Sequence, residues 1–275
     1  NMKRILIVGP DFYNYNKSVQ DAFASIGYET KVISYIENLV RYIDIIRYHY
    51  MPKIGVNSFF NGYKKKINME IKNTFDRFLP DMVFVIKGGI LDKDLLSYMD
   101  NTIKVLWMMD SVKNIKGIQN TINDYDYRLA FEKTDVEILN NNGVPTYFMP
   151  MGLDDAIYFP KYYKHKKIDI TFIGALYDGR KEFLEKLIVD LKDYNIKVYG
   201  KYLSFKNPRT FLNYFIKGFR NSFTNKTISP NEVNEIYNNS KIAINIHHGQ
   251  SVYGCNPRFL EILGSGTFQI VDDNI

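Results

Sequence analysis

Short apolar runs, each ended by glycine, proline or a polar residue, recur along the whole chain. Uninterrupted apolar runs of this length are typical of strands buried on both faces of a parallel sheet. The first one, Ile5 to Val8, is ended by Gly9-Pro10. The runs predict strands at 4–8, 30–36, 82–86, 103–108, 127–131, 168–173, 196–199, 241–247 and 267–271.

Segments between these runs carry apolar residues at helical spacing. Ser229-Pro230-Asn231-Glu232 is a capping box with proline at the first helical position, so Val233, Ile236 and Tyr237 are expected on a buried helix face. The pattern predicts helices at 17–26, 91–99, 134–141, 180–191, 230–237 and 257–263, with an irregular helical stretch within 36–79. Strands alternating with helices indicate parallel sheets with helices on both faces.

The alternation stops between Met149 and Lys167, where no apolar periodicity remains. The chain has 275 residues, enough for two domains. We therefore predict two Rossmann-like, doubly wound α/β domains, one at 1–155 and one at 156–275. The carboxyl ends of strands bind ligands in such sheets, so the candidate chemistry is sought there.

Composition narrows the class of protein without choosing a function. Hydrophobic residues make up 45% and charged residues 24%, which excludes wholesale disorder. Cys255 is the single cysteine and no apolar run is long enough to span a bilayer, so we expect a cytoplasmic protein. The net charge of +6 favours phosphate-bearing partners, including nucleotides, nucleic acids and anionic membranes.

Two glycine-containing strand ends in the second domain are candidate phosphate-binding turns. Gly174 begins a turn that leads to Arg180 at the start of a helix, and Gly200 ends the following strand. Backbone amides at a helix start bind anions, and an arginine can bind a diphosphate through two of its guanidinium nitrogens. The alternative is a plain strand-to-helix turn with a solvated arginine.

The densest group of polar residues follows the strand at 241–247. Asn245 and His247 end the strand, Asn256 is a natural N-cap, and Arg258 and Glu261 share one helix face. Glu261 is suited to accept hydrogen bonds from a ribose diol, and His247 to donate one to phosphate or sugar. The alternatives are a surface ion pair and a core histidine. His247 and His248 point to opposite faces of a strand, so no metal site is predicted.

Asp110 ends a strand of the first domain and is a candidate catalytic base or ligand of an acceptor hydroxyl; its alternative role is capping before Val112.

Motifs of serine hydrolases, P-loop ATPases and dinucleotide dehydrogenases are absent from the sequence. The aromatic and basic segment 211–226 could contact a membrane surface or nucleic acid. A packed insertion with a solvated basic edge is the favoured interpretation.

Six blocks of the chain resemble the CgeB-like glycosyltransferases, group-1 transferases of bacteria with the GT-B fold. These blocks are residues 80–88, 105–110, 148–154, 172–180, 236–247 and 256–266. The resemblance implies that the second domain binds a nucleotide-sugar donor and the first an acceptor. It also implies that Glu261 binds the ribose hydroxyls and that Arg180 and Arg258 bind the diphosphate. Metal is not expected, because GT-B enzymes generally work without a bound ion.

The chain departs from this family twice. Tyr253 stands where the family's first motif glutamate is expected, and the chain ends soon after Val271, as if its C-terminal part were truncated.

We predict transfer of a sugar from a nucleoside-diphosphate sugar, foremost a UDP-sugar, with no further cofactor. The acceptor class is open among glycan, protein and lipid-linked molecules. The alternatives are a non-catalytic sugar-nucleotide or glycan-binding protein and, less favoured, a nucleic-acid-binding protein. Peripheral contact with the inner membrane face is left open.

Overall fold

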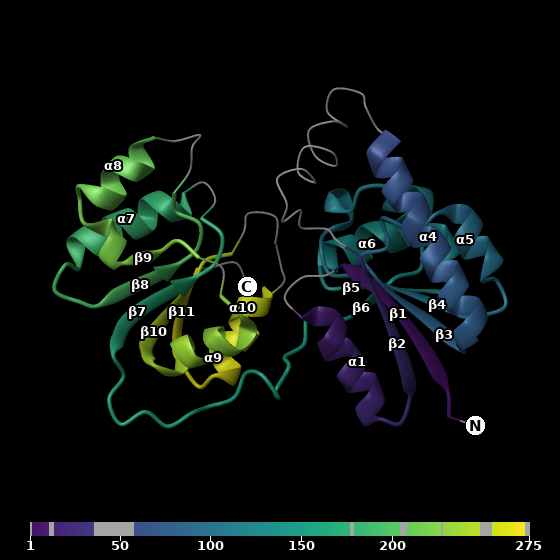
Figure 1. Ribbon diagram of the computed structural model, residues 1–275, viewed down its shortest axis with the longest axis horizontal. Coiled ribbons are helices and arrows are strands. Elements are labelled where there is room, and N and C mark those ends of the chain that lie inside the picture. Colours follow the sequence, from purple (N-terminus) through teal and green to yellow (C-terminus); the bar gives the residue numbers. More distant parts are fainter. Residues whose placement is uncertain are drawn as a thin grey trace. The chain divides into compact units, whose positions relative to one another are not determined.

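The computed structural model describes residues 2–10, 14–35, 58–176, 179–203, 208–226, 228–247 and 255–272. The chain divides into two compact units, Asn1–Pro150 and Met151–Ile275. The sequence predicts this break at residue 155. Figure 1 shows that each unit has a sheet with helices packed against it. The predicted irregular helix at 36–79 is described only from residue 58 onward.

The described part of the first unit has a six-stranded sheet in the order β2-β1-β3-β4-β5-β6, and every neighbouring pair is parallel. Its strands are β1 (Arg4–Pro10), β2 (Glu29–Tyr35), β3 (Met82–Ile86), β4 (Ile103–Met108), β5 (Tyr127–Ala130) and β6 (Tyr147–Phe148). Its helices are α1 (Tyr15–Ser25), α4 (Ser58–Phe78), α5 (Lys93–Tyr98) and α6 (Lys133–Asn141).

Both faces of this first sheet are covered, as the apolar runs predict. Leu6 and Val8 of β1 belong to one core cluster with Ile71 of α4. On the opposite face, Phe84 of β3 packs edge to face on Phe23 of α1, with ring centroids 5.4 Å apart. Because alternate residues of a strand point to opposite faces, an apolar run places side chains in both cores.

The described part of the second unit has a five-stranded parallel sheet in the order β11-β10-β7-β8-β9. Its strands are β7 (Ile168–Ile173), β8 (Ile196–Tyr199), β9 (Phe223–Thr224), β10 (Ser240–Asn245) and β11 (Phe268–Val271). Its helices are α7 (Arg180–Asp190), α8 (Arg209–Phe215), α9 (Pro230–Asn238) and α10 (Pro257–Gly264).

Helices also cover both faces of the second sheet. Phe172 packs with Leu184 of α7 on one face, while Ala243 packs with Tyr237 of α9 and Ile262 of α10 on the other. The predicted α/β class with two doubly wound parallel sheets is therefore confirmed.

The segment 211–226 contributes Phe219 and Phe223 to the core, as a packed insertion would. Its helix α8 and strand β9 were not predicted.

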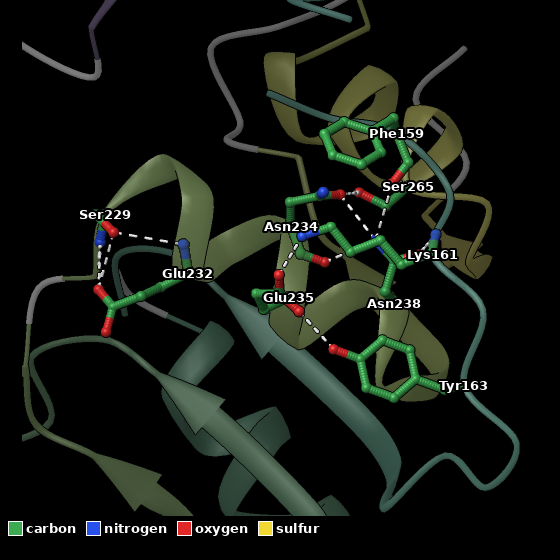
Figure 2. A network of polar contacts seen from close by, with 9 residues as sticks. All are labelled: Phe159, Lys161, Tyr163, Ser229, Glu232, Asn234, Glu235, Asn238 and Ser265. Carbon is green, nitrogen blue, oxygen red and sulfur yellow. Dashed lines mark hydrogen bonds and ion pairs between the residues drawn. The ribbon is translucent and has the colours of Figure 1, made fainter. Parts of the chain in front are cut away.

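Buried asparagines join the segment around residues 159–161, which precedes β7, to α9 through hydrogen bonds (Figure 2). The Asn238 amide nitrogen donates to the carbonyl oxygens of Phe159 and Asn234 at 3.1 and 2.9 Å, and its oxygen accepts the Lys161 N–H at 2.5 Å. The Ser265 hydroxyl donates to the Asn234 side chain at 2.7 Å, which joins α10 to α9. Backbone groups of an irregular segment need such partners once they are buried.

Charged groups close the same network at the surface (Figure 2). Glu235 accepts from the Lys161 ammonium and the Tyr163 hydroxyl, and these hydrogen bonds hold the pKa of Glu235 below its usual value. The predicted capping box is also present: the Glu232 N–H donates to Ser229 Oγ at 3.4 Å, and the Ser229 N–H donates to the Glu232 carboxylate at 2.9 Å.

Replacing Asn238 by Ala should destabilise the protein strongly. The change removes one buried and two part-buried hydrogen bonds to backbone groups, for which we expect a loss of about 2–4 kcal/mol in the free energy of unfolding. Chemical denaturation measures this loss. The neighbouring Asn239, whose side chain accepts one exposed Lys167 N–H, is the matched control. Asn239→Ala should cost less than about 1 kcal/mol; equal losses would mean that the network does not stabilise the unit.

Candidate functional site

The candidate site of the second unit lies at the carboxyl end of β10. β10 pairs in parallel with β7 on one side and with β11 on the other. The residues that follow these three strands therefore lie at one edge of the sheet. They include Gly174 after β7, His247 after β10 and Asp272 after β11.

His247 is fully buried and both of its ring nitrogens are engaged. Its Nδ1 lies 2.6 Å from Asp272 Oδ1, and its backbone N–H donates to the same carboxylate at 2.9 Å. A carboxylate only accepts, so Nδ1 carries the proton and Nε2 is the acceptor. Nε2 faces the Asn256 N–H at 3.5 Å. This geometry makes His247 a positioning residue between two strand ends and α10. This arrangement leaves no ring N–H for the hydrogen bond to phosphate or sugar that the sequence predicts, and it fits the alternative of a core histidine.

Asn256 caps α10, as the sequence predicts. Its side-chain oxygen accepts the Phe259 N–H at 2.9 Å, and its nitrogen donates to Asn245 Oδ1 at 2.9 Å. Asn245 is buried, and its own amide nitrogen has no hydrogen-bond partner within the described residues. A buried amide left unpaired costs about 1–3 kcal/mol, and such a group calls for an explanation. A ligand that offers an acceptor oxygen would supply one.

Arg258 and Glu261 form an ion pair on the first turns of α10. Glu261 is only 7% exposed, which disfavours the alternative of a solvated surface pair. The pair also borders the buried Tyr237. Burial raises the pKa of the Tyr237 hydroxyl, while the neighbouring Arg258 acts in the opposite direction through its charge and a hydrogen bond. The carboxylate and the guanidinium are thus fixed at the start of the helix that Asn256 caps.

Arg180 connects the ends of β7 and β10. Its guanidinium donates to the carbonyl oxygen of Ala175 at 3.0 Å and to that of Ile246 at 2.6 Å. Gly200 packs directly on the end of β7, because an added Cβ would lie 2.3 Å from the Gly174 carbonyl oxygen. The structure therefore brings Gly174, Gly200 and Arg180 together at neighbouring strand ends. Binding of a diphosphate by Arg180 remains a prediction, and residues 177–178 of its turn lie outside the described ranges.

Asp110 lies in the first unit, after β4. Lys87, which follows the neighbouring strand β3, places its ammonium 2.6 Å from the half-exposed Asp110 carboxylate. The capping role considered for Asp110 is taken by Asp135, whose carboxylate accepts the Val112 N–H at 3.0 Å and the Ser111 hydroxyl at 3.1 Å. Asp110 is therefore held by a cation at a strand end, where it can accept a hydrogen bond.

Sequence reasoning missed two carboxylates at strand ends. Asp272 follows β11 and binds His247, whereas Glu132 follows β5 and is almost completely buried. Both stand directly after predicted apolar runs, which was the available signal. Tyr253 and His248, which the sequence analysis singles out, lie outside the described residues.

Two kinds of feature are absent from the described part of the chain. It contains no group of three or more His, Cys, Asp or Glu side chains placed to hold a metal ion. Among the helices described, none combines the length and the apolar character that crossing a bilayer requires.

Residues 180–274 match the family model described as Glycosyl transferase-like. The second unit is thus similar to glycosyltransferases from α7 to beyond β11, a stretch that contains Arg180, Asn245, His247, Arg258 and Glu261. The finer resemblance to CgeB-like proteins remains a prediction. No curated protein sequence matches the chain.

Solved structures show the same fold over most of the chain. A glycosyltransferase from Rickettsia africae matches with a TM-score of 0.58 at 13% identity, over 98% of this chain and 79% of that one. A UDP-forming α,α-trehalose-phosphate synthase from Burkholderia vietnamiensis gives 0.56 at 10% identity, over 100% and 85%. A UDP-GlcNAc 2-epimerase from Neisseria meningitidis, bound to UDP-GlcNAc, gives 0.56 at 11% identity, over 88% and 77%. These likenesses confirm the GT-B fold class.

Substitution of Asp272 tests the His247 arrangement through stability. Asp272→Ala removes the acceptor of two buried donors and should lower the free energy of unfolding by about 1–3 kcal/mol. Asp272→Asn keeps one acceptor oxygen and should lose less. Denaturant titration of the three proteins gives the order directly. Wild-type stability in Asp272→Ala would contradict the arrangement.

Proposed function

We propose that this chain is a glycosyltransferase that takes a sugar from a nucleoside-diphosphate sugar bound by its second unit. The observation that carries the proposal is the Arg258–Glu261 ion pair at the start of α10, whose carboxylate is buried. The same helix start is capped by Asn256, which donates to Asn245 Oδ1. The Asn245 amide nitrogen has no hydrogen-bond partner among the described residues. Carboxylate, guanidinium and amide thus lie together within the segment that matches the glycosyl transferase-like model.

Each of these groups suits one part of a nucleotide-sugar. The Glu261 carboxylate can accept hydrogen bonds from two ribose hydroxyls. Arg258 and Arg180 supply fixed positive charge for the negative charge that develops on the departing diphosphate. We therefore propose catalysis without a bound metal. Uridine diphosphate is the first nucleotide to consider, since the synthase is named UDP-forming and the epimerase was solved with UDP-GlcNAc.

The first unit is proposed to bind the acceptor. Asp110 is the candidate base for an inverting transfer, in which it would take the proton from the attacking acceptor hydroxyl. A retaining transfer would need no such base. Lys87 keeps the carboxylate at the strand end in either case. The acceptor is open among glycan, protein and lipid-linked molecules.

A second candidate is a non-catalytic protein that binds sugar nucleotides or glycans. Tyr253 favours it, because the CgeB-like pattern has a glutamate there. His247 and Arg180 also donate hydrogen bonds to neighbouring protein groups, and these donors are then not directed at a ligand. The epimerase likeness shows that this fold also occurs in a protein named for a different reaction.

Calorimetric titration with UDP, GDP, TDP and ADP, with and without magnesium, tests the donor site. We expect selective binding that does not need magnesium and that weakens at least about tenfold in Glu261→Ala and in Arg258→Ala. Glu137→Ala, an exposed glutamate of α6, is the control and should bind like wild type. Failure to bind any of the four nucleotides would overturn the proposed donor site.

Turnover separates the two candidates once a nucleotide is identified. A transferase should release the nucleoside diphosphate from its sugar donor when an acceptor is present. If the sugar product is inverted, Asp110→Asn should lower kcat by about 100-fold or more while nucleotide affinity stays unchanged. Tight binding with no turnover of any donor and acceptor pair would support the non-catalytic protein instead.

A further inference from the structure

Helix α8 exposes an apolar face that the described residues do not cover. Thr210 is buried and Tyr214 packs against the core formed by Phe172, Phe219 and Phe223. The opposite side of the helix carries Leu212, Phe215 and Ile216, which are 53%, 59% and 74% exposed. These three residues stand at i, i+3 and i+4 and so share one face.

An outward face of this kind is unusual for a surface helix. A helix at the surface of a globular unit normally points polar side chains to water and apolar ones to the core. A contiguous exposed apolar patch with a polar rim marks an interaction site. Leu212, Phe215 and Ile216 form what is here called the α8 patch. Figure 1 shows α8 on the side of its unit where β8 and β9 lie.

Basic residues flank the α8 patch along the chain. Arg209 begins the helix, Lys217 follows it, and Arg220 lies in the short 3₁₀ turn Phe219–Asn221; all three are exposed. Between described residues, no ion pair involves any of them. The sequence from 194 to 231 contains no Asp or Glu, whereas Lys and Arg recur in it. The patch and its rim thus combine apolar side chains with uncompensated positive charge.

We propose that the α8 patch docks the second unit on an anionic lipid surface. Apolar side chains that enter the boundary of a bilayer, beside basic side chains at the level of the headgroups, are the physical basis of peripheral membrane binding. Each basic residue near the surface adds electrostatic attraction that salt screens. This interaction goes beyond the proposed transfer reaction and does not depend on it.

Flotation of the full chain with vesicles tests the proposal. Phosphatidylcholine vesicles containing phosphatidylglycerol should bind the protein, vesicles of phosphatidylcholine alone should bind it at least about tenfold more weakly, and added salt should release it. Phe215→Ser with Ile216→Ser should weaken binding at least about tenfold. Phe268→Ser is the matched control, because Phe268 is 68% exposed on the edge strand β11, at the other edge of the sheet.

A charge-matched pair tests the basic rim. Lys217→Gln with Arg220→Gln should weaken binding to anionic vesicles several-fold, whereas Lys113→Gln with Lys116→Gln, exposed in the first unit, should not. Thermal unfolding checks that each variant is folded, as substitutions at these exposed positions should leave Tm unchanged.

Three results would overturn the proposal. The first is no binding of wild type to anionic vesicles, and the second is an equal loss in the Phe268→Ser control. The third is a different partner for the patch. Self-association abolished by Phe215→Ser would assign the patch to a second copy of the chain, and oligonucleotide binding that depends on Lys217 and Arg220 but not on Phe215 would assign it to nucleic acid.

Discussion

Parallel pairing on both sides of β10 is the constraint on which the candidate donor site depends. Because β7, β10 and β11 run in the same direction, their carboxyl ends meet at one edge of the sheet. The residues after these strands then have to share a small space with the start of α10. Gly200 is needed for the same reason, since the ends of β7 and β8 approach so closely that a Cβ would strike the Gly174 carbonyl.

Buried polar contacts fix this edge more firmly than apolar packing alone would. Asp272 determines which nitrogen of His247 carries the proton, and His247 in turn faces the backbone of Asn256 at the start of α10. Arg180 adds a tie between the ends of β7 and β10. Such networks are stabilising only when their members are satisfied. Among the described residues the amide nitrogen of Asn245 alone in this network lacks a partner, so we expect a bound ligand to meet the framework there.

The two proposals concern different surfaces of the second unit, and they bear on each other through the acceptor. The donor site would lie at the carboxyl edge of the sheet, whereas the α8 patch lies on a helix that packs against the core beside β8 and β9. A unit that docks on an anionic bilayer would bring its donor to molecules held there. A lipid-linked acceptor would then be the most accessible of the three acceptor classes, because diffusion along a surface replaces diffusion through solution.

The sequence by itself determined most strands, most helices and the α/β class, because apolar period and helix caps are local properties of the chain. It therefore placed the caps Ser229 and Asn256 and the Arg258–Glu261 pair correctly. It missed β6, β9 and α8, since two-residue strands and a helix with apolar residues on both sides carry no readable period. Only the tertiary structure decided the order of the strands, and with it the His247–Asp272 and Lys87–Asp110 contacts. These partners are far apart along the chain, so their meeting depends on which strands become neighbours.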